Sequence, residues 1–240
     1  MKNGDPKLVE ILKSGAERVV NAETLALTAL RRAIITGALA PGEEIDEELV
    51  AGHLNISRSP VRQAMGILEA EGLVKRIYRR GVIVTELTAD EIEEIYNMRA
   101  LLEGLAIRRA VPNYTAEHVA RLKAFLGKCP EDGDNRDAFV EWNARFHALL
   151  YEPSGWDRLL ATISQLRNNT ARYTAVSHHL VSRLYDPDNG HGEILEACES
   201  RDADRAERLT RKHILAAMDT LIQTLGQTEG WADRGDGRER

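Results

Sequence analysis

The sequence predicts a mainly α-helical protein of two domains, an N-terminal winged helix-turn-helix with a small β-hairpin wing and a C-terminal antiparallel bundle of six helices. Three observations support this class. Short apolar runs around a basic segment occupy the first third of the chain, whereas from Thr88 onward apolar residues recur at the spacing of long helices. The 240 residues also exceed one typical domain of ~100–150 residues.

Composition divides the chain into four segments. The first residues hold a few apolar side chains that could form a short extra helix, and the last residues are low in apolar content, which is typical of disorder. The segments are an N-terminal extension over 1–20, the winged helix-turn-helix over 21–87, the helical bundle over 88–226 and a disordered tail over 227–240.

Three short helices are predicted at the start of the first domain. The first covers Ala26–Ile35, where apolar residues recur at helical spacing. The second is capped by Asp46 and ends at Asn55. The third runs from Ser57 to Glu71, with a glycine directly after it as its stop.

Two short apolar stretches follow the third helix. They are Leu73–Ile77 and Val82–Thr85, and they bracket Arg79-Arg80-Gly81. This pattern predicts a β-hairpin, which would be the wing.

Two arginines open the third helix. Arg58 and Arg62 are four residues apart, so both lie on one face near the N-terminal end. In a recognition helix that end meets base edges in the major groove, where Arg donates two hydrogen bonds to guanine. Residues 57–80 hold six Lys or Arg and two Glu, a net charge of +4, whereas the whole chain carries −6. This concentration favours DNA contact over an ordinary solvated helix face.

Four motifs over residues 24–86 match a known pattern. They are Gly37-Ala38-Leu39-Ala40-Pro41-Gly42, Leu54-Asn55-Ile56-Ser57-Arg58-Ser59-Pro60-Val61-Arg62, Leu68-Glu69-Ala70-Glu71-Gly72-Leu73-Val74 and Arg80-Gly81-Val82. They resemble the DNA-binding domain of the GntR family of bacterial transcription regulators. The resemblance implies that DNA contacts come from Ser57, Arg58, Ser59, Arg62, Arg80 and Gly81. Glu48 departs from the pattern, since some members carry a DNA-contacting arginine there, and we expect it to add nothing to affinity.

The second domain is predicted to contain six helices joined by short turns. Thr88-Ala89-Asp90-Glu91 matches a capping box at the start of the first of them. The predicted helices cover 88–111, 115–129, 135–151, 156–184, 190–199 and 203–225.

Three of the seven histidines lie on the apolar stripes of three different helices. They are His147, with Asn143 one turn before it, His191 and His213. A single inward histidine is usually a hydrogen-bonded core residue, but three unpaired imidazoles in one apolar core are costly. A divalent metal bound by neutral imidazole nitrogens at ~2.0–2.1 Å offsets that cost.

The same positions resemble the C-terminal helical (FCD) ligand-binding domain of the FadR-type branch of this family, over about residues 90–225. The predicted bundle has six helices rather than seven, and in this it is similar to the shorter, VanR-like subgroup of that branch. The resemblance implies a metal in the bundle cavity, held here by Asn143, His147, His191 and His213.

Asn143 is a departure, because aspartate is the usual residue at that position of the family. Replacing a carboxylate by an amide raises the net charge of the metal site from about +1 to about +2. We therefore expect weaker metal binding and a stronger attraction for an anionic effector. Zinc is the expected ion, with nickel or another divalent transition metal as alternatives.

Arg99 lies on the inward stripe of the first bundle helix, four residues before Glu103. Two interpretations stay open. The first is an internal ion pair with Glu103. The second is an anchor for an effector carboxylate, to which a guanidinium is well matched.

The sequence thus predicts a transcription regulator rather than an enzyme. We expect a homodimer that binds an inverted repeat in double-stranded operator DNA and responds to a small organic-acid effector near the metal. The alternatives are a metal-dependent hydrolase with an accessory DNA-binding head, and a regulator with a metal-free effector pocket. Against the hydrolase, the inward stripes show no carboxylate beside the histidines other than Glu103 that could act as general base.

The expected location is the cytoplasm. The N-terminus shows no apolar core of a signal peptide, and no apolar run approaches the ~20 residues that span a membrane. Cys129 and Cys198 are far apart in sequence and outside any CxxC motif, as expected of reduced thiols.

Overall fold

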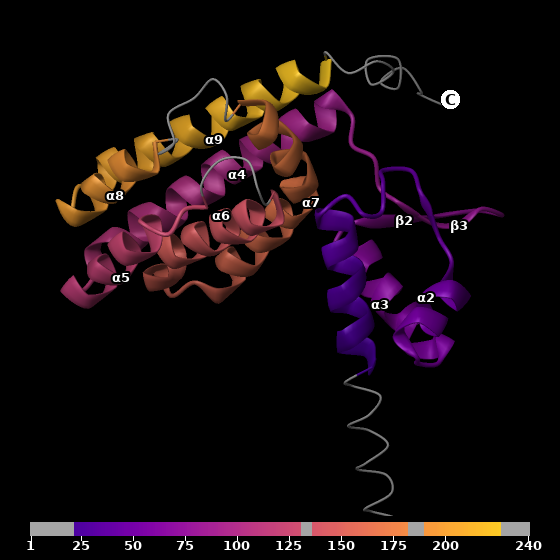
Figure 1. Cartoon of the computed structure of the whole chain (residues 1–240). Coiled ribbons are helices and arrows are strands. Elements are labelled where there is room, and N and C mark those ends of the chain that lie inside the picture. The colour runs from indigo at the N-terminus through magenta and orange to yellow at the C-terminus, as the bar shows by residue number, and fades with distance from the viewer. Residues whose placement is uncertain (1–21, 131–135, 182–189, 227–240) are drawn as a thin grey trace, which may run out of the picture. The chain divides into compact units, whose positions relative to one another are not determined.

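The computed structural model describes residues 22–130, 136–181 and 190–226 (Figure 1). The chain divides into two compact units, Met1–Glu86 and Leu87–Arg240. The predicted extension over 1–20, with its short helix, and the predicted disordered tail over 227–240 lie outside the described residues.

The first unit is a helix-turn-helix with a small sheet. Its described helices and strands are a helix over 22–35, β1 (Glu44–Ile45), α2 (Glu47–Leu54), α3 (Arg58–Ala70), β2 (Val74–Ile77) and β3 (Gly81–Val84).

Local signals in the sequence fix the ends of α2. The Asp46 side chain accepts hydrogen bonds from the backbone N–H groups of Glu48 and Leu49, which are two of the unpaired donors at the helix start. Asn55 ends the helix in the left-handed conformation, with φ 54°. Both predicted boundaries of this helix are confirmed.

The amphipathic helix α3 packs one face into the core of the first unit. Its buried residues are Pro60, Val61, Ala64, Met65 and Leu68. They lie against apolar residues of the helix over 22–35 and of the sheet. The opposite face, which carries Arg58 and Arg62, is exposed.

The predicted hairpin is confirmed, but it belongs to a three-stranded sheet with the order β1-β3-β2. Strands β2 and β3 pair antiparallel from Val74↔Val84 to Ile77↔Gly81. Strand β1 also pairs antiparallel with β3 and was missed from the sequence. Two residues are too few to show the alternation that identifies a strand.

In the part of the chain that the structure describes, the second unit contains six α-helices and two short 3₁₀ turns. They are α4 (Ala89–Ala110), η1 (Val111–Asn113), α5 (Ala116–Leu126), α6 (Arg136–Tyr151), η2 (Glu152–Ser154), α7 (Asp157–Val181), α8 (His191–Glu199) and α9 (Ala203–Gly226). The predicted class, a mainly helical protein with a winged helix-turn-helix and a helical bundle, is confirmed.

The long helices α4 and α9 lie side by side, and α6 and α7 form a second pair of neighbours (Figure 1). The predicted capping box is present, since Thr88 accepts from the Glu91 N–H and the Glu91 carboxylate accepts from the Thr88 N–H. The predicted helix end at about Val111 is confirmed, since Val111 is the C-cap of α4 and begins the turn η1 around Pro112. One apolar cluster of this unit gathers buried residues from all six helices, of which α4, α6, α8 and α9 also carry residues of the candidate site.

Candidate functional site

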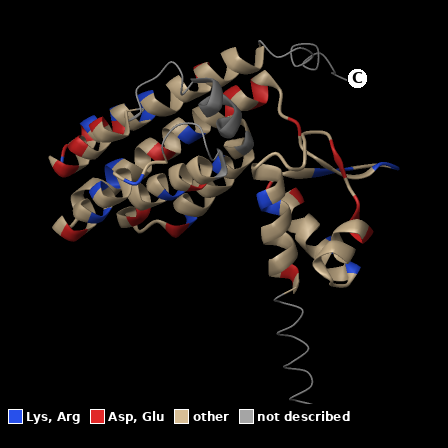
Figure 2. Ribbon diagram, viewed as in Figure 1, with Lys and Arg blue, Asp and Glu red and all other residues tan. Residues whose placement is uncertain are grey.

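The six residues predicted to contact DNA are all exposed on the first unit. Ser57 is the N-cap of α3, and Ser59 and the two arginines lie in its first turns. Arg80 and Gly81 lie at the turn between β2 and β3, where Gly81 has φ 86°. The ribbon in Figure 2 is coloured blue, for Lys and Arg, at positions along this hairpin.

The two arginines of α3 are paired with acidic residues at the start of α2. Arg62 Nη2 lies 2.9 Å from Glu47 Oε2, and Arg62 Nε donates to the same oxygen at 3.1 Å. Arg58 Nη1 lies 3.6 Å from Glu48 Oε2. The hydrogen bond and the negative charge of Glu47 raise the pKa of Arg62. Glu47 therefore favours one orientation of the Arg62 guanidinium on the exposed face of α3.

The three predicted histidines converge in the second unit, from α6, α8 and α9. One ring nitrogen of each of His147, His191 and His213 lies within 4.8 Å of the others. His147 Nε2 and His191 Nε2 are 3.3 Å apart. His147 and His191 are buried, and His213 is half-buried. Gly190 supports this geometry, since its φ of 79° lets the chain enter α8 directly before His191.

Asn143 lies one turn before His147 on α6, as predicted. Its Oδ1 atom is buried and finds no hydrogen-bond partner among the described residues. A buried acceptor without a donor costs roughly 1–3 kcal/mol. Three imidazole nitrogens and an oxygen acceptor that lacks a donor, on a residue one turn from His147, are ligand types that fit a divalent metal.

A chain of hydrogen bonds that begins at Nδ1 orients the His147 ring. His147 Nδ1 lies 3.0 Å from the Tyr151 hydroxyl oxygen, and that hydroxyl donates to Glu103 Oε2 at 2.8 Å. Because the hydroxyl has one proton, which Glu103 accepts, the proton of the His147–Tyr151 bond comes from Nδ1. His147 Nε2 then carries the lone pair of the ring, and this nitrogen faces His191 Nε2 at 3.3 Å. An outer partner of this kind is typical of metal-binding histidines.

Two guanidiniums neutralise the buried carboxylate at the end of this chain. Arg99 Nε donates to Glu103 Oε1 at 2.9 Å, and Arg167 Nη1 donates to Glu103 Oε2 at 3.0 Å. Arg99 Nη1 also donates to Thr170 Oγ1 at 3.1 Å. The structure thus shows the ion pair that was one of the two interpretations of Arg99.

The charge states around Glu103 follow from burial and from these neighbours. Burial alone would raise the pKa of Glu103, but Arg99 and Arg167 outweigh it and lower this pKa, so the carboxylate is ionised. Burial, reinforced by Arg167, places the pKa of His147 well below its usual value. His147 is therefore neutral, which is the form that binds metal.

Tyr151 and Arg167 were missed from the sequence. Tyr151 follows His147 by four residues on α6, so the helical spacing could have indicated their contact. Arg167 lies 64 residues from Glu103, and no local signal connects the two.

The fold and both candidate sites define a class of protein, DNA-binding regulators with a helical sensor domain. Residues 25–84 match the family described as bacterial regulatory proteins, gntR family, and residues 94–216 match the FCD domain. The chain belongs to the GntR family of bacterial transcription regulators, in the group that carries an FCD domain.

Curated relatives agree with this family. The chain is 30% identical over 195 residues to the uncharacterized HTH-type transcriptional regulator YdhC of Bacillus subtilis (strain 168), covering 78% of this chain and 83% of the relative. It is 27% identical over 204 residues to the HTH-type transcriptional repressor RspR of Escherichia coli (strain K12), covering 84% of this chain and 90% of the repressor. These relatives are regulators, so the chain is a transcription regulator and not an enzyme.

Solved structures share the fold. The chain resembles E. coli McbR/YncC with a TM-score of 0.72 at 23% identity, covering 84% of this chain and 97% of that one. It resembles a protein described as a transcriptional regulator GntR from Rhodococcus sp. RHA1 with a TM-score of 0.70 at 25% identity, covering 86% and 98%. Among the described residues, no helix has both the length and the apolar character needed to cross a bilayer.

Proposed function

We propose that this regulator binds an inverted-repeat operator as a homodimer, and that an organic-acid effector controls its affinity through a divalent metal in the second unit. The observation that carries the proposal is the convergence of three imidazoles from three helices. The unpartnered amide oxygen of Asn143, one helical turn before His147, supports it. Because operator DNA lies in the bacterial cytoplasm, the proposal also places this regulator there.

The DNA contacts in this proposal come from the first unit. Arg58 and Arg62 read base edges from the N-terminal end of α3, while Ser57 and Ser59 donate to phosphate. Arg80 and Gly81 bring the turn between β2 and β3 to the backbone or minor groove. The exposure of all six residues supports these roles.

The metal ligands in this proposal are Asn143, His147, His191 and His213. A bound transition metal, which we take to be zinc with nickel as an alternative, would supply a Lewis-acidic position for an effector oxygen. The chain's own contribution is orientation, because Tyr151 fixes the His147 ring and Glu103 fixes Tyr151. Arg99 would hold a second effector oxygen by exchanging its bond to Glu103 for one to the effector.

Asn143→Asp is expected to tighten metal binding at least tenfold, because a carboxylate attracts a divalent cation more strongly than an amide oxygen does. The measurement is a competition titration of zinc between the protein and a chromophoric chelator. Asn97→Asp, on the exposed face of α4, adds the same charge away from the cluster and should leave zinc affinity unchanged. Equal affinities for wild type and Asn143→Asp would remove Asn143 from the ligand set.

An exposed apolar stripe on α4 supports the homodimer. Met98, Leu101 and Leu105 lie on one face of this helix and are 38%, 57% and 41% exposed. Trp156, 44% exposed, extends the stripe, since the Arg109 guanidinium next along α4 lies 5.0 Å from its ring centre. Neighbouring apolar side chains exposed on one face are typical of a surface that pairs with another copy.

Leu101→Glu is expected to convert the dimer to a monomer, because two copies of the new carboxylate would meet in a desolvated interface. Light scattering coupled to size exclusion measures the mass of each species. Ala216→Glu, at an exposed position of α9, is the matched control and should remain dimeric. A wild-type protein that is monomeric both free and on its operator would contradict the homodimer, and a dimeric Leu101→Glu would exclude this surface.

A further inference from the structure

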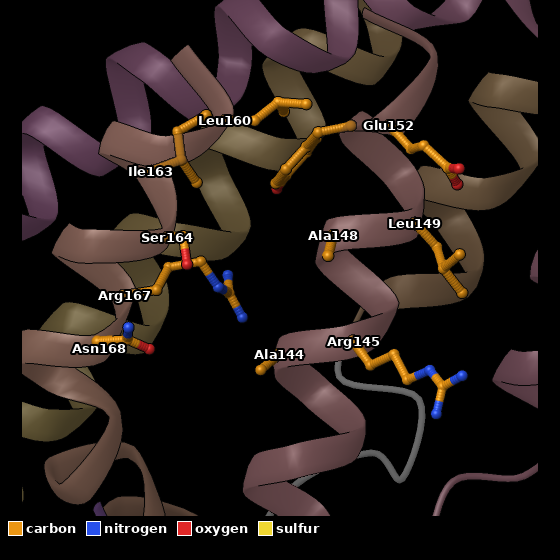
Figure 3. A pocket seen from close by; sticks show the side chains of 11 residues that line it. Ala144, Arg145, Ala148, Leu149, Glu152, Leu160, Ile163, Ser164, Arg167 and Asn168 are labelled. Carbon is orange, nitrogen blue, oxygen red and sulfur yellow. The ribbon is translucent and has the colours of Figure 1, made fainter. Parts of the chain in front are cut away.

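A pocket of about 320 Å³ lies between α6 and α7 (Figure 3). Its walls are mostly apolar, and none of the three clustered histidines lines it. The space exists because α6 presents two alanines, Ala144 and Ala148, toward α7, which contributes Leu160 and Ile163. This volume is at the lower end of the range for small-molecule sites.

Arg167 connects this pocket to the buried network. Its guanidinium points into the space between the two helices (Figure 3), and its side chain is only 12% exposed. Nη1 donates to Glu103, and Nη2 donates to the backbone oxygen of Asn143 at 3.3 Å. A guanidinium has five N–H donors in one plane, so these two bonds leave donors for a ligand in the pocket.

The other charged residues of the pocket are directed elsewhere. The Glu152 carboxylate pairs with Arg121 on α5. The Arg145 guanidinium lies over the Phe125 ring, 5.7 Å from its centre, and points away from Arg167 in Figure 3. The pocket therefore offers one positive anchor beside apolar walls.

We propose that the pocket between α6 and α7 binds an apolar monocarboxylate whose carboxylate pairs with Arg167. The inference rests on the proposed function in one respect, that the occupant acts on the metal cluster. A monocarboxylate matches one guanidinium, and its apolar body matches Ala144, Ala148, Leu160 and Ile163. Polyhydroxy acids match less well, because α7 offers their several hydroxyl groups only two uncharged polar side chains in this lining, Ser164 and Asn168.

The occupant would act on the histidine cluster through two residues. A carboxylate bound to the remaining donors of Arg167 adds a second negative charge to this guanidinium and so weakens its attraction for Glu103. Glu103 then redistributes its bonds between Arg99 and Tyr151, and Tyr151 changes its hold on the His147 ring. The pocket is thus a second ligand site, distinct from the metal and linked to it through Arg167 and Glu103.

Calorimetry with phenylacetate as probe tests the pocket on the full-length protein, with and without cobalt. We expect phenylacetate to bind the wild type, and Ala148→Phe, which fills the pocket, to weaken binding at least tenfold. Ala161→Phe, on the exposed face of α7 outside the pocket, should bind as the wild type does. Phenylacetamide, which lacks the charge, should bind at least tenfold more weakly. Both alanines are exposed on helices, so neither variant is expected to disturb folding.

The visible spectrum of the cobalt-loaded protein tests the link to the cluster, and we expect phenylacetate to shift it in the wild type and not in Ala148→Phe. Phenylacetate binding that is absent, or equal in wild type and Ala148→Phe, would overturn the pocket. Loss of the dimer in Ala148→Phe without phenylacetate binding would assign this face to an interface between copies instead. Binding without a spectral shift would overturn the link. Failure of cobalt to bind would count against the proposed metal, while calorimetry still decides the pocket.

Discussion

Arg62→Ala is expected to weaken operator binding by roughly ten- to one-hundredfold and to relax base preference at one position of each half-site. The variant removes a guanidinium that α3 presents at its N-terminal end and that Glu47 holds in place. Fluorescence anisotropy on an operator selected from random DNA by the protein itself measures the loss. Binding to unrelated DNA at the same salt concentration should fall less, because that binding depends on total charge.

Two controls separate the base contact from general charge. Arg205→Ala removes an arginine of the second unit, paired with Glu196, and should leave operator affinity unchanged. Glu47→Gln keeps the shape of the residue but weakens its hold on Arg62, so we expect a smaller loss of specificity than in Arg62→Ala. Unchanged operator affinity in Arg62→Ala would mean that α3 is not the recognition helix.

His213→Ala is expected to abolish zinc binding and the effector response, while basal operator binding stays within about twofold of wild type. Loss of one of three imidazoles leaves too few ligands for a stable tetrahedral site. His213 is the best position for this test because it is half-buried, whereas His147 is buried and bonded to Tyr151. The readouts are metal content after dialysis and operator affinity with and without organic acids.

His118→Ala is the matched control, since His118 lies on α5 outside the cluster and bonds the Leu149 carbonyl. It should keep both zinc and the effector response. A full effector response in metal-free His213→Ala would show that sensing needs no metal.

Periodicity and capping residues predicted most of the fold, because these signals are local. The helical stripes alone predict that His147, His191 and His213 face inward, and the folded chain brings their rings together. Helix ends were less accurate. The end of α5 is Leu126 rather than Cys129, because the final turn of a helix depends on its surroundings.

Contacts between distant elements could not be predicted. Glu47 and Arg62 are 15 residues apart on different helices, and they meet only because α2 packs against α3. Glu103 was recognised as a partner of Arg99, but its bonds to Arg167 and Tyr151 depend on how three helices pack. Such contacts carry no periodic signal in one sequence.

Anomalous X-ray diffraction from crystals of the zinc-loaded protein, recorded on both sides of the zinc absorption edge, tests the central claim most directly. We predict one strong peak per chain, ~2.0–2.1 Å from a ring nitrogen of each of His147, His191 and His213. We also predict that Asn143 Oδ1 is the fourth protein ligand of this zinc ion. No peak at this position, or a peak held by other residues, would contradict a metal-centred sensor in this regulator.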